Sequence, residues 1–164
     1  MKSVFNCKIS SDKYKLQELH SQFSWIPGSS HIRPNDKILR QKLVDNVFLP
    51  LVYNSIKDYV FVKHFNFKPS LNDKNKIECL EEDIENKIVL VKNEYPYELP
   101  PNTFHYVLWY SHFYSKTEKD INQDIFNCLT QQLKHQRFEF VWYENPNMSI
   151  PEVYHLQVFW HIKA

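Results

Sequence analysis

The chain has 164 residues, a length typical of one compact domain, and its 20 basic and 19 acidic residues give a net charge of +1. This balance excludes a protein held on nucleic acid or on an anionic membrane by its overall charge. The single glycine, Gly28, excludes P-loops and the dinucleotide-binding G-x-G-x-x-G motif, because both need at least two glycines.

The first third of the chain, residues 1–67, is predicted to be helical. Residues 12–24 carry apolar side chains at roughly helical spacing, namely Tyr14, Leu16, Leu19 and Phe23. The segment WIPGSSHIRPND then interrupts the chain, and Asn35 or Asp36 can cap a second helix. An apolar stripe follows, at Leu39, Leu43, Val47, Leu51, Ile56 and Val60. Pro50 lies within it, so we expect a kink or two consecutive helices.

The remainder is predicted to alternate a polar excursion with strands and one helix. Residues 68–86 are polar and are expected on the surface. The strands are expected at 88–93, 104–111, 137–144 and 149–162, with an amphipathic helix at 117–134. This order, β-β-α-β-β over residues 87–164 after a helical part, predicts an α+β fold with a mainly antiparallel sheet. We expect residues 1–164 to form a single domain.

Cysteine spacing and the N-terminal residues indicate the compartment. Cys7, Cys79 and Cys128 are odd in number and far apart, which favours neither a disulfide framework nor a zinc site. No apolar signal region and no run of transmembrane length are present in the sequence. We expect a cytoplasmic protein. Scarce Gly and Ala beside abundant Lys, Asn and Ile suggest an AT-rich genome, so a viral protein in the cytoplasm of a host cell is one interpretation.

The stretch SIPEVYHLQVFWHI, residues 149–162, carries the most unusual strand pattern. His155, Gln157, Phe159 and His161 alternate with aliphatic residues and Trp160, so they share one face. That face can be core, can bind a ligand, or can be catalytic. His155 and His161 lie about 20 Å apart along a strand, so they cannot share a metal ion. We predict no metal site and no cofactor.

The abundance of aromatic residues has two interpretations: packing in the core, or a stacking site for a planar ligand. The chain has 12 Phe, 10 Tyr and 4 Trp, and with so little Ala and Gly most of them must fill the core. A pair of aromatic rings can also hold a nucleobase or a methylated cap by stacking. The candidates for such a pair are Tyr95, Tyr97, Trp109, Trp142, Tyr143 and Trp160.

Two segments resemble a known family. KNEYPYELPPNTFHYVLWYS (92–111) and FVWYENPNMSIPEVYHLQVFW (140–160) are similar to the fungal N-acetylglucosamine-induced protein family, a domain of unknown function. IRPNDKILRQKL (32–43) and YNSIKDYVFVKHFNF (53–67) resemble its helical part. The positions that match the family motifs are Asn93, Pro96, Tyr97, His105, Val107, Trp109, Trp142, Asn145, Ser149 and His155.

A more distant resemblance is to the histidine-triad nucleotide-binding superfamily. Its last strand carries H-φ-H-φ-H, in which the central histidine is the nucleophile. Here His155 matches the first position, Gln157 stands at the central one, and Phe159 at the third. Ser149 stands where that superfamily has a phosphate-contacting serine. A carboxamide nitrogen is not a comparable nucleophile, so we predict that covalent nucleotidyl transfer is lost.

The resemblance implies a histidine-triad-like, non-catalytic protein that binds a nucleotide-like or mRNA-cap-like ligand. The expected ligand-binding residues are His155, Gln157, Ser149, His105, Trp109, Tyr97, Asn93 and Asn145. The alternatives are a protein-interaction or host-modulating module without a small-molecule ligand, and a nucleotidyl hydrolase or transferase. We expect no membrane partner and no strong non-specific nucleic-acid binding. A homodimer stays open, by analogy with histidine-triad proteins.

Overall fold

A computed structural model describes residues 16–26, 34–112, 115–145 and 148–163. Three helices come first: α1 (Leu16–Gln22), α2 (Asp36–Val52) and α3 (Ile56–Lys63). A small hairpin follows, made of β1 (Ser70–Leu71) and β2 (Ile77–Glu78), and then a short 3-10 turn at Glu81–Asp83. The chain ends with β3 (Ile88–Lys92), β4 (Thr103–Tyr110), α4 (Glu118–Leu133), β5 (Phe138–Tyr143) and β6 (His155–Ile162).

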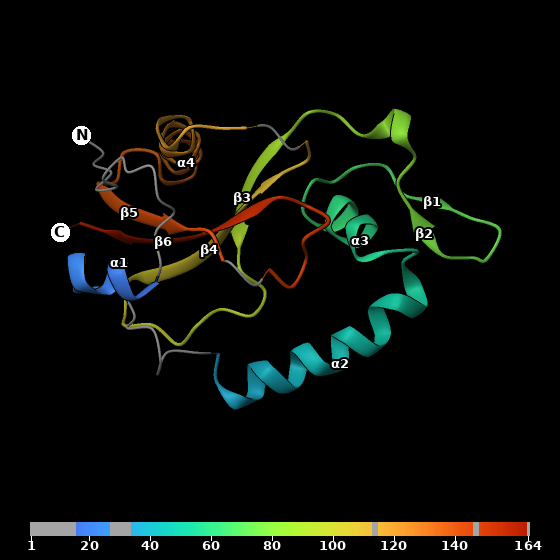
Figure 1. The fold of residues 1–164 in the computed structure, drawn as a ribbon, viewed down its shortest axis with the longest axis horizontal. Coiled ribbons are helices and arrows are strands. Elements are labelled where there is room, and N and C mark those ends of the chain that lie inside the picture. Colours follow the sequence, from blue (N-terminus) through green and yellow to red (C-terminus); the bar gives the residue numbers. More distant parts are fainter. Residues whose placement is uncertain (1–15, 27–33, 113–114, 146–147, 164) are drawn as a thin grey trace.

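The fold class is α+β, and both described sheets are antiparallel, as the sequence predicted. The order β3-β4-α4-β5-β6 agrees with the predicted β-β-α-β-β arrangement after a helical part. The main sheet has the strand order β3-β4-β6-β5, so the strand carrying His155 and Gln157 lies inside the sheet (Figure 1). It begins at His155, and the first residues of the 149–162 stretch form a loop instead.

The two faces of the main sheet are covered by different helices. On one face α4 packs its apolar stripe, including Ile125 and Leu129, into a core with Leu108, Leu156 and Val158. The opposite face carries Val107 and Trp109, which form a second cluster with Val60, Phe61 and Phe65 of α3 and the turn after it. At the other end of that face, the Trp25 ring stacks on His161 at a centroid distance of 4.2 Å. Gln157 and Phe159 lie between these two covered ends.

The second and third helices start and stop as their residues dictate. The Asn35 side chain accepts a hydrogen bond from the backbone N–H of Ile38, which caps α2. Pro50 lies in the last turn of α2, and a separate helix, α3, begins after Ser55 caps it. The predicted interruption is therefore two consecutive helices. Residues 68–86, predicted as a polar surface segment, contain the β1–β2 hairpin.

Asparagine takes the backbone positions that glycine usually fills. The described residues with left-handed φ angles are Asn66, Asn75, Asn102 and Lys134, with φ between 50° and 66°. A short polar side chain tolerates this region better than a branched one. A chain with one glycine therefore uses asparagine to make tight turns, including the turn at Asn102 that leads into β4.

The apolar stripe of α2 faces outward. No residue of α2 is buried, and its contacts with the rest of the chain come from Ile38, Lys42, Asp45 and Leu49, which are half-buried. Leu43, Val47 and Leu51 of the predicted stripe are each about two-thirds exposed. In the described part of the chain, no helix has the length and apolar character needed to cross a bilayer.

Candidate functional site

The predicted site residues that the structure brings together lie on the α3 side of the main sheet. The register pairs His105 with Phe159, Val107 with Gln157, and Trp109 with His155. Since alternate residues of a strand share a face, β4 and β6 together present imidazole, indole and carboxamide groups. The bend at residues 93–102, between β3 and β4, adds Asn93 and Tyr97.

The centre of the site is a hydrogen-bonded network of one imidazole and two amides. The backbone N–H of Tyr97 donates to His105 Nδ1 at 3.2 Å, so the neutral ring carries its proton on Nε2. That N–H donates to Gln157 Oε1 at 2.6 Å, and Asn93 Nδ2 donates to the same oxygen at 3.1 Å. The backbone N–H of Tyr95 fixes the other end of Asn93 by donating to its Oδ1 at 2.8 Å. Each member therefore has a defined orientation.

This network leaves one donor group unused. Gln157 accepts two hydrogen bonds through Oε1, and no described residue hydrogen-bonds to its Nε2. The side chain is half-buried. A carboxamide that accepts on one side and is held there by two donors points its NH₂ group in a fixed direction. The result is a pre-oriented donor pair in the middle of the sheet face.

His105 is electrically neutral in this setting. It is 3% exposed, and burial lowers its pKa to about 4, against the opposing effect of the hydrogen bond to Gln157. Its ring also stacks on Phe159 at a centroid distance of 4.5 Å. At neutral pH the network therefore carries no charge of its own, unlike a site built on a protonated histidine.

His155 forms the second part of the site with Trp109. Its Nδ1–H donates to the carbonyl of Val153 at 2.8 Å, so the lone pair of the neutral ring lies on Nε2. Burial lowers the pKa of His155, although the bond to Val153 acts in the opposite direction. No described residue hydrogen-bonds to Nε2. A neutral imidazole with a free lone pair can accept a hydrogen bond or act as a general base.

Trp109 lies between two imidazole rings. Its centroid is 4.3 Å from that of His155 and 5.5 Å from that of His64, and the His64 ring is nearly parallel to it. The indole is 5% exposed, and among the described residues its Nε1–H has no hydrogen-bond partner. An unpaired buried donor costs about 1–3 kcal/mol, so such a group in a native fold usually meets a water molecule or a ligand.

Two residues beside this cluster, His64 and Glu94, were not predicted from the sequence. His64 Nε2 donates to Glu94 Oε1 at 2.8 Å, and the Tyr59 hydroxyl donates to Glu94 Oε2 at 2.6 Å. Burial raises the pKa of the Glu94 carboxyl, but these two hydrogen bonds, together with the nearby His64 and Lys63, lower it more, and the pKa lies below its usual value. The position of Glu94, next to Asn93 in the bend, was the available sequence signal.

Aromatic side chains border the amide network on its other side. Tyr97 is half-buried, with its ring 4.6 Å from His105 and 6.0 Å from Phe159 between centroids. Tyr143 of β5 is nearly parallel to Phe159 at 6.1 Å, and the Tyr97 and Tyr143 hydroxyls are 3.4 Å apart. Tyr143 was among the aromatic candidates for stacking but not among the expected ligand-binding residues.

Two predicted site residues, Asn145 and Ser149, lie in the segment between β5 and β6. Ser149 is exposed in the loop before β6, and no hydrogen bond of its side chain is found within the described part of the chain. Asn145 is half-buried just after β5, two residues beyond the Tyr143 that borders the network. Asn93, Tyr97, His105 and Gln157 therefore form one contact group, and Trp109 with His155 forms another beside it.

Comparisons with known proteins add one distant likeness. No protein-family model and no curated protein matches the chain. A solved structure titled "Crystal Structure of HTC1" is similar with a TM-score of 0.45 and 13% sequence identity, over 89% of this chain and 82% of that one. A likeness this distant carries no argument about function.

Proposed function

We propose that this chain is a non-catalytic binding protein for a nucleotide-like ligand, a class that includes mRNA-cap-like nucleotides. The observation that supports the proposal best is the oriented, unused NH₂ group of Gln157. In this proposal the group donates a hydrogen bond to an acceptor atom of the ligand, and Nε2 of His155 supplies a nearby acceptor for a ligand N–H.

The charges favour recognition of the nucleoside part of the ligand over its phosphates. His105 is neutral, and burial also lowers the pKa of His155. The acidic Glu94 lies beside the cluster. A group of neutral donors and acceptors bordered by Tyr97 suits a planar polar ring, because such rings combine a stacking surface with hydrogen-bonding edges. Ser149, exposed in its loop, is proposed to contact the ligand from outside the sheet.

The absence of covalent chemistry in the proposal follows from Gln157. A nucleophile needs an available lone pair, and the amide nitrogen of Gln157 shares its lone pair with the carbonyl. Its oxygen already accepts two hydrogen bonds. A bound nucleotide would therefore be held without forming a bond to this strand.

Substitution of Gln157 by glutamate tests the proposal most directly. The Gln157→Glu side chain keeps an oxygen for His105 and Asn93 but lacks the NH₂ group. We expect calorimetric titration with nucleosides, mononucleotides, dinucleoside polyphosphates and cap analogues to find a ligand for the wild type. The variant should bind it about tenfold more weakly or worse, since the ligand acceptor is left unpaired.

The matched control is Gln131→Glu, the same change at an exposed position of α4 on the far side of the sheet. It should bind like the wild type. Ser149→Ala tests the predicted serine contact in the same titrations. Absence of binding to every ligand at millimolar concentration would contradict the proposal and favour an interaction module. Equal binding by Gln157→Glu and wild type would show that Gln157 is structural.

A second candidate function, a nucleotidyl hydrolase, is favoured by the free lone pair of His155. In this case Nε2 would accept a proton from a water molecule that attacks the ligand. Turnover of a nucleotidyl ester that is lost in His155→Ala, and kept in Gln131→Ala, would establish it. Binding without turnover would reject it.

A further inference from the structure

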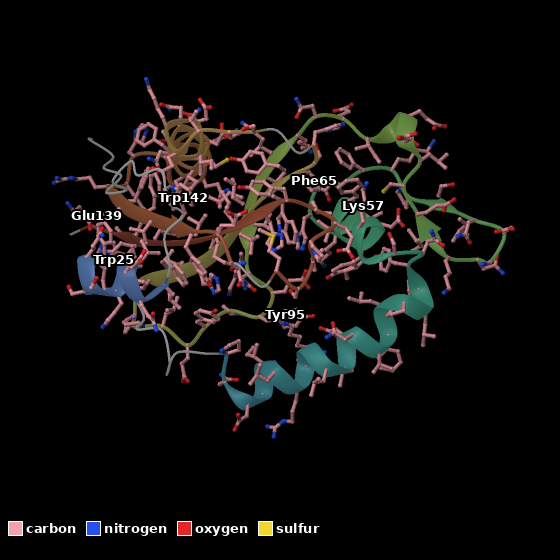
Figure 2. The ribbon with its side chains drawn as sticks, in the orientation of Figure 1. Trp25, Lys57, Phe65, Tyr95, Glu139 and Trp142 are labelled. Carbon is pink, nitrogen blue, oxygen red and sulfur yellow. The ribbon has the colours of Figure 1, made fainter. Side chains whose placement is uncertain are left out.

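The outer surface of α2 is an exposed apolar patch, which we call the α2 face. It consists of Leu39, Leu43, Val44, Val47, Phe48, Leu51 and Val52, whose exposed fractions range from 38% to 67%. Figure 2 shows side chains projecting from this helix on the side away from the sheet. We propose that the α2 face is the interface of a homodimer, in which it packs against the same face of a second copy.

Polar contacts connect the opposite side of α2 to the rest of the chain. The Tyr95 hydroxyl donates to Asp45 Oδ2 at 2.7 Å, and Lys42 Nζ lies 5.7 Å from the centroid of the Tyr95 ring. Asp45 also accepts a hydrogen bond from Gln41 in the same helix. Tyr95 is labelled between the bend and α2 in Figure 2. Since Lys42 and Asp45 face the rest of the chain, the residues on the opposite side of the helix face away from it.

The area of the α2 face is suited to a stable pair. Seven partly exposed apolar side chains offer apolar surface on the order of 500 Å². That is the size of the largest apolar patch on a typical monomeric protein, and a patch of this size is often functional. Two copies would bury about 1,000 Å² of apolar surface together, which reaches the size at which specific interfaces begin. A second copy therefore supplies enough surface to cover the face.

The side-chain spacing makes the face self-complementary. Leu39, Leu43, Val47 and Leu51 form one row with a spacing of four residues, and Val44, Phe48 and Val52 form a parallel row. The groove between two such rows accepts a row of the same kind from another helix, at a crossing angle of about 50°. A two-fold axis near Val47 would place Leu43 opposite Leu51 of the second copy.

The charge distribution also favours a second copy. Between Leu43 and Val52 the one charged residue is Asp45, which is turned toward Tyr95. A two-fold axis brings identical groups together, so a charged surface would repel itself, whereas this one does not. The charged residues Asp36, Lys37 and Arg40 lie at the N-terminal end of α2, away from the proposed axis.

Sedimentation of the full chain tests the dimer. The wild type should show a concentration-dependent monomer–dimer equilibrium at roughly 10–100 µM chain. Val47→Glu and Leu43→Glu should each weaken the association at least tenfold while keeping the wild-type circular dichroism spectrum, because both positions are exposed in the single chain. Gln131→Glu in α4, with the same added charge, should leave the association unchanged.

A cross-link locates the axis. Val47→Cys should form a disulfide-linked pair under mild oxidation, identified by mass spectrometry as the 47–47 peptide, whereas Gln131→Cys should not. A wild type that stays monomeric at 100 µM would overturn the proposal. So would a dimer that resists Val47→Glu and Leu43→Glu, or wild-type chain that sediments only with phospholipid vesicles. None of these outcomes depends on whether a nucleotide binds Gln157.

Discussion

His105 links the stability of the fold to the candidate site. It is neutral when folded because burial lowers its pKa to about 4, whereas an imidazole in an unfolded chain titrates near 6.5. Between these values the unfolded chain binds the additional proton. The contribution of His105 to stability should therefore be constant above about pH 6.5 and fall by about 3 kcal/mol as the pH drops toward 4.

Urea unfolding at a series of pH values checks this expectation. In His105→Asn the slope of unfolding free energy against pH, between pH 6.5 and 4, should be smaller than in the wild type by about 1 kcal/mol per unit. His135→Asn, which removes an exposed imidazole, should retain the wild-type slope. Equal slopes in wild type and His105→Asn would show that His105 is not held neutral in the fold.

Asn122 offers a second test at the residue scale. Its Oδ1 accepts a hydrogen bond from Trp142 Nε1 at 2.7 Å, and both side chains are buried against the sheet. Asn122→Leu removes the acceptor and leaves the buried indole N–H without this partner. We expect a loss of about 1–3 kcal/mol in unfolding free energy, measured by urea denaturation. Asn127→Leu, at an exposed position further along α4, should lower the unfolding free energy far less.

At the residue scale, the sequence predicted which residues belong to the site better than it predicted the hydrogen bonds between them. Residue types and a resemblance pointed to Asn93, Tyr97, His105 and Gln157, and the four do meet. The bond between His105 and Gln157 joins residues 52 positions apart, and only the strand register brings them together. Ser149 was predicted from its motif position alone, and it lies in a loop whose path cannot be predicted from apolar periodicity. His64 was not predicted, because a single histidine at the end of a helix belongs to no sequence motif.

At the element scale, helix α4 begins at a capping motif in its first turn. Thr117 Oγ1 accepts from the N–H of Asp120 at 3.1 Å, and the Asp120 carboxylate accepts from the N–H of Thr117 at 3.2 Å. This reciprocal pair is a capping box. Thr117→Ala should lower the unfolding free energy by about 1 kcal/mol in urea denaturation.

The matched substitution is Thr130→Ala, at an exposed position inside α4. It should be neutral or slightly stabilising, because alanine has the highest helix propensity and no cap is lost. If both variants lost the same stability, the effect would not come from capping.

The elements themselves were largely predictable, since apolar periodicity places strands and helices whatever their partners. What periodicity cannot specify is whether an apolar stripe is covered. The α4 stripe, with Ile121, Ile125 and Leu129, packs into the core, while the α2 stripe, also with a spacing of four residues, lies in solvent. On the opposite side of α2, Asp45 and Lys42 make the contacts with Tyr95.

In the molecule as a whole, stability should be unevenly distributed. Most residues of β4 and β6 are buried, whereas α2 has no buried residue. We expect amide hydrogens of α2 to exchange with deuterium at least tenfold faster than those of β4 and β6 in dilute solution. Protection of α2 should rise with chain concentration if the helix pairs with a second copy. Equal protection of α2 and the central strands from hydrogen exchange would contradict an uneven distribution of stability.

The position of β6 between β4 and β5 has a consequence for synthesis. The ribosome makes β3, β4 and β5 before the strand that joins β5 to the other two. Until residues 155–162 emerge, β4 and β5 each have an unpaired edge, the kind of surface on which nascent chains associate wrongly. The main sheet can therefore close only after its last strand has been translated, and a chain stopped before His155 would retain both open edges.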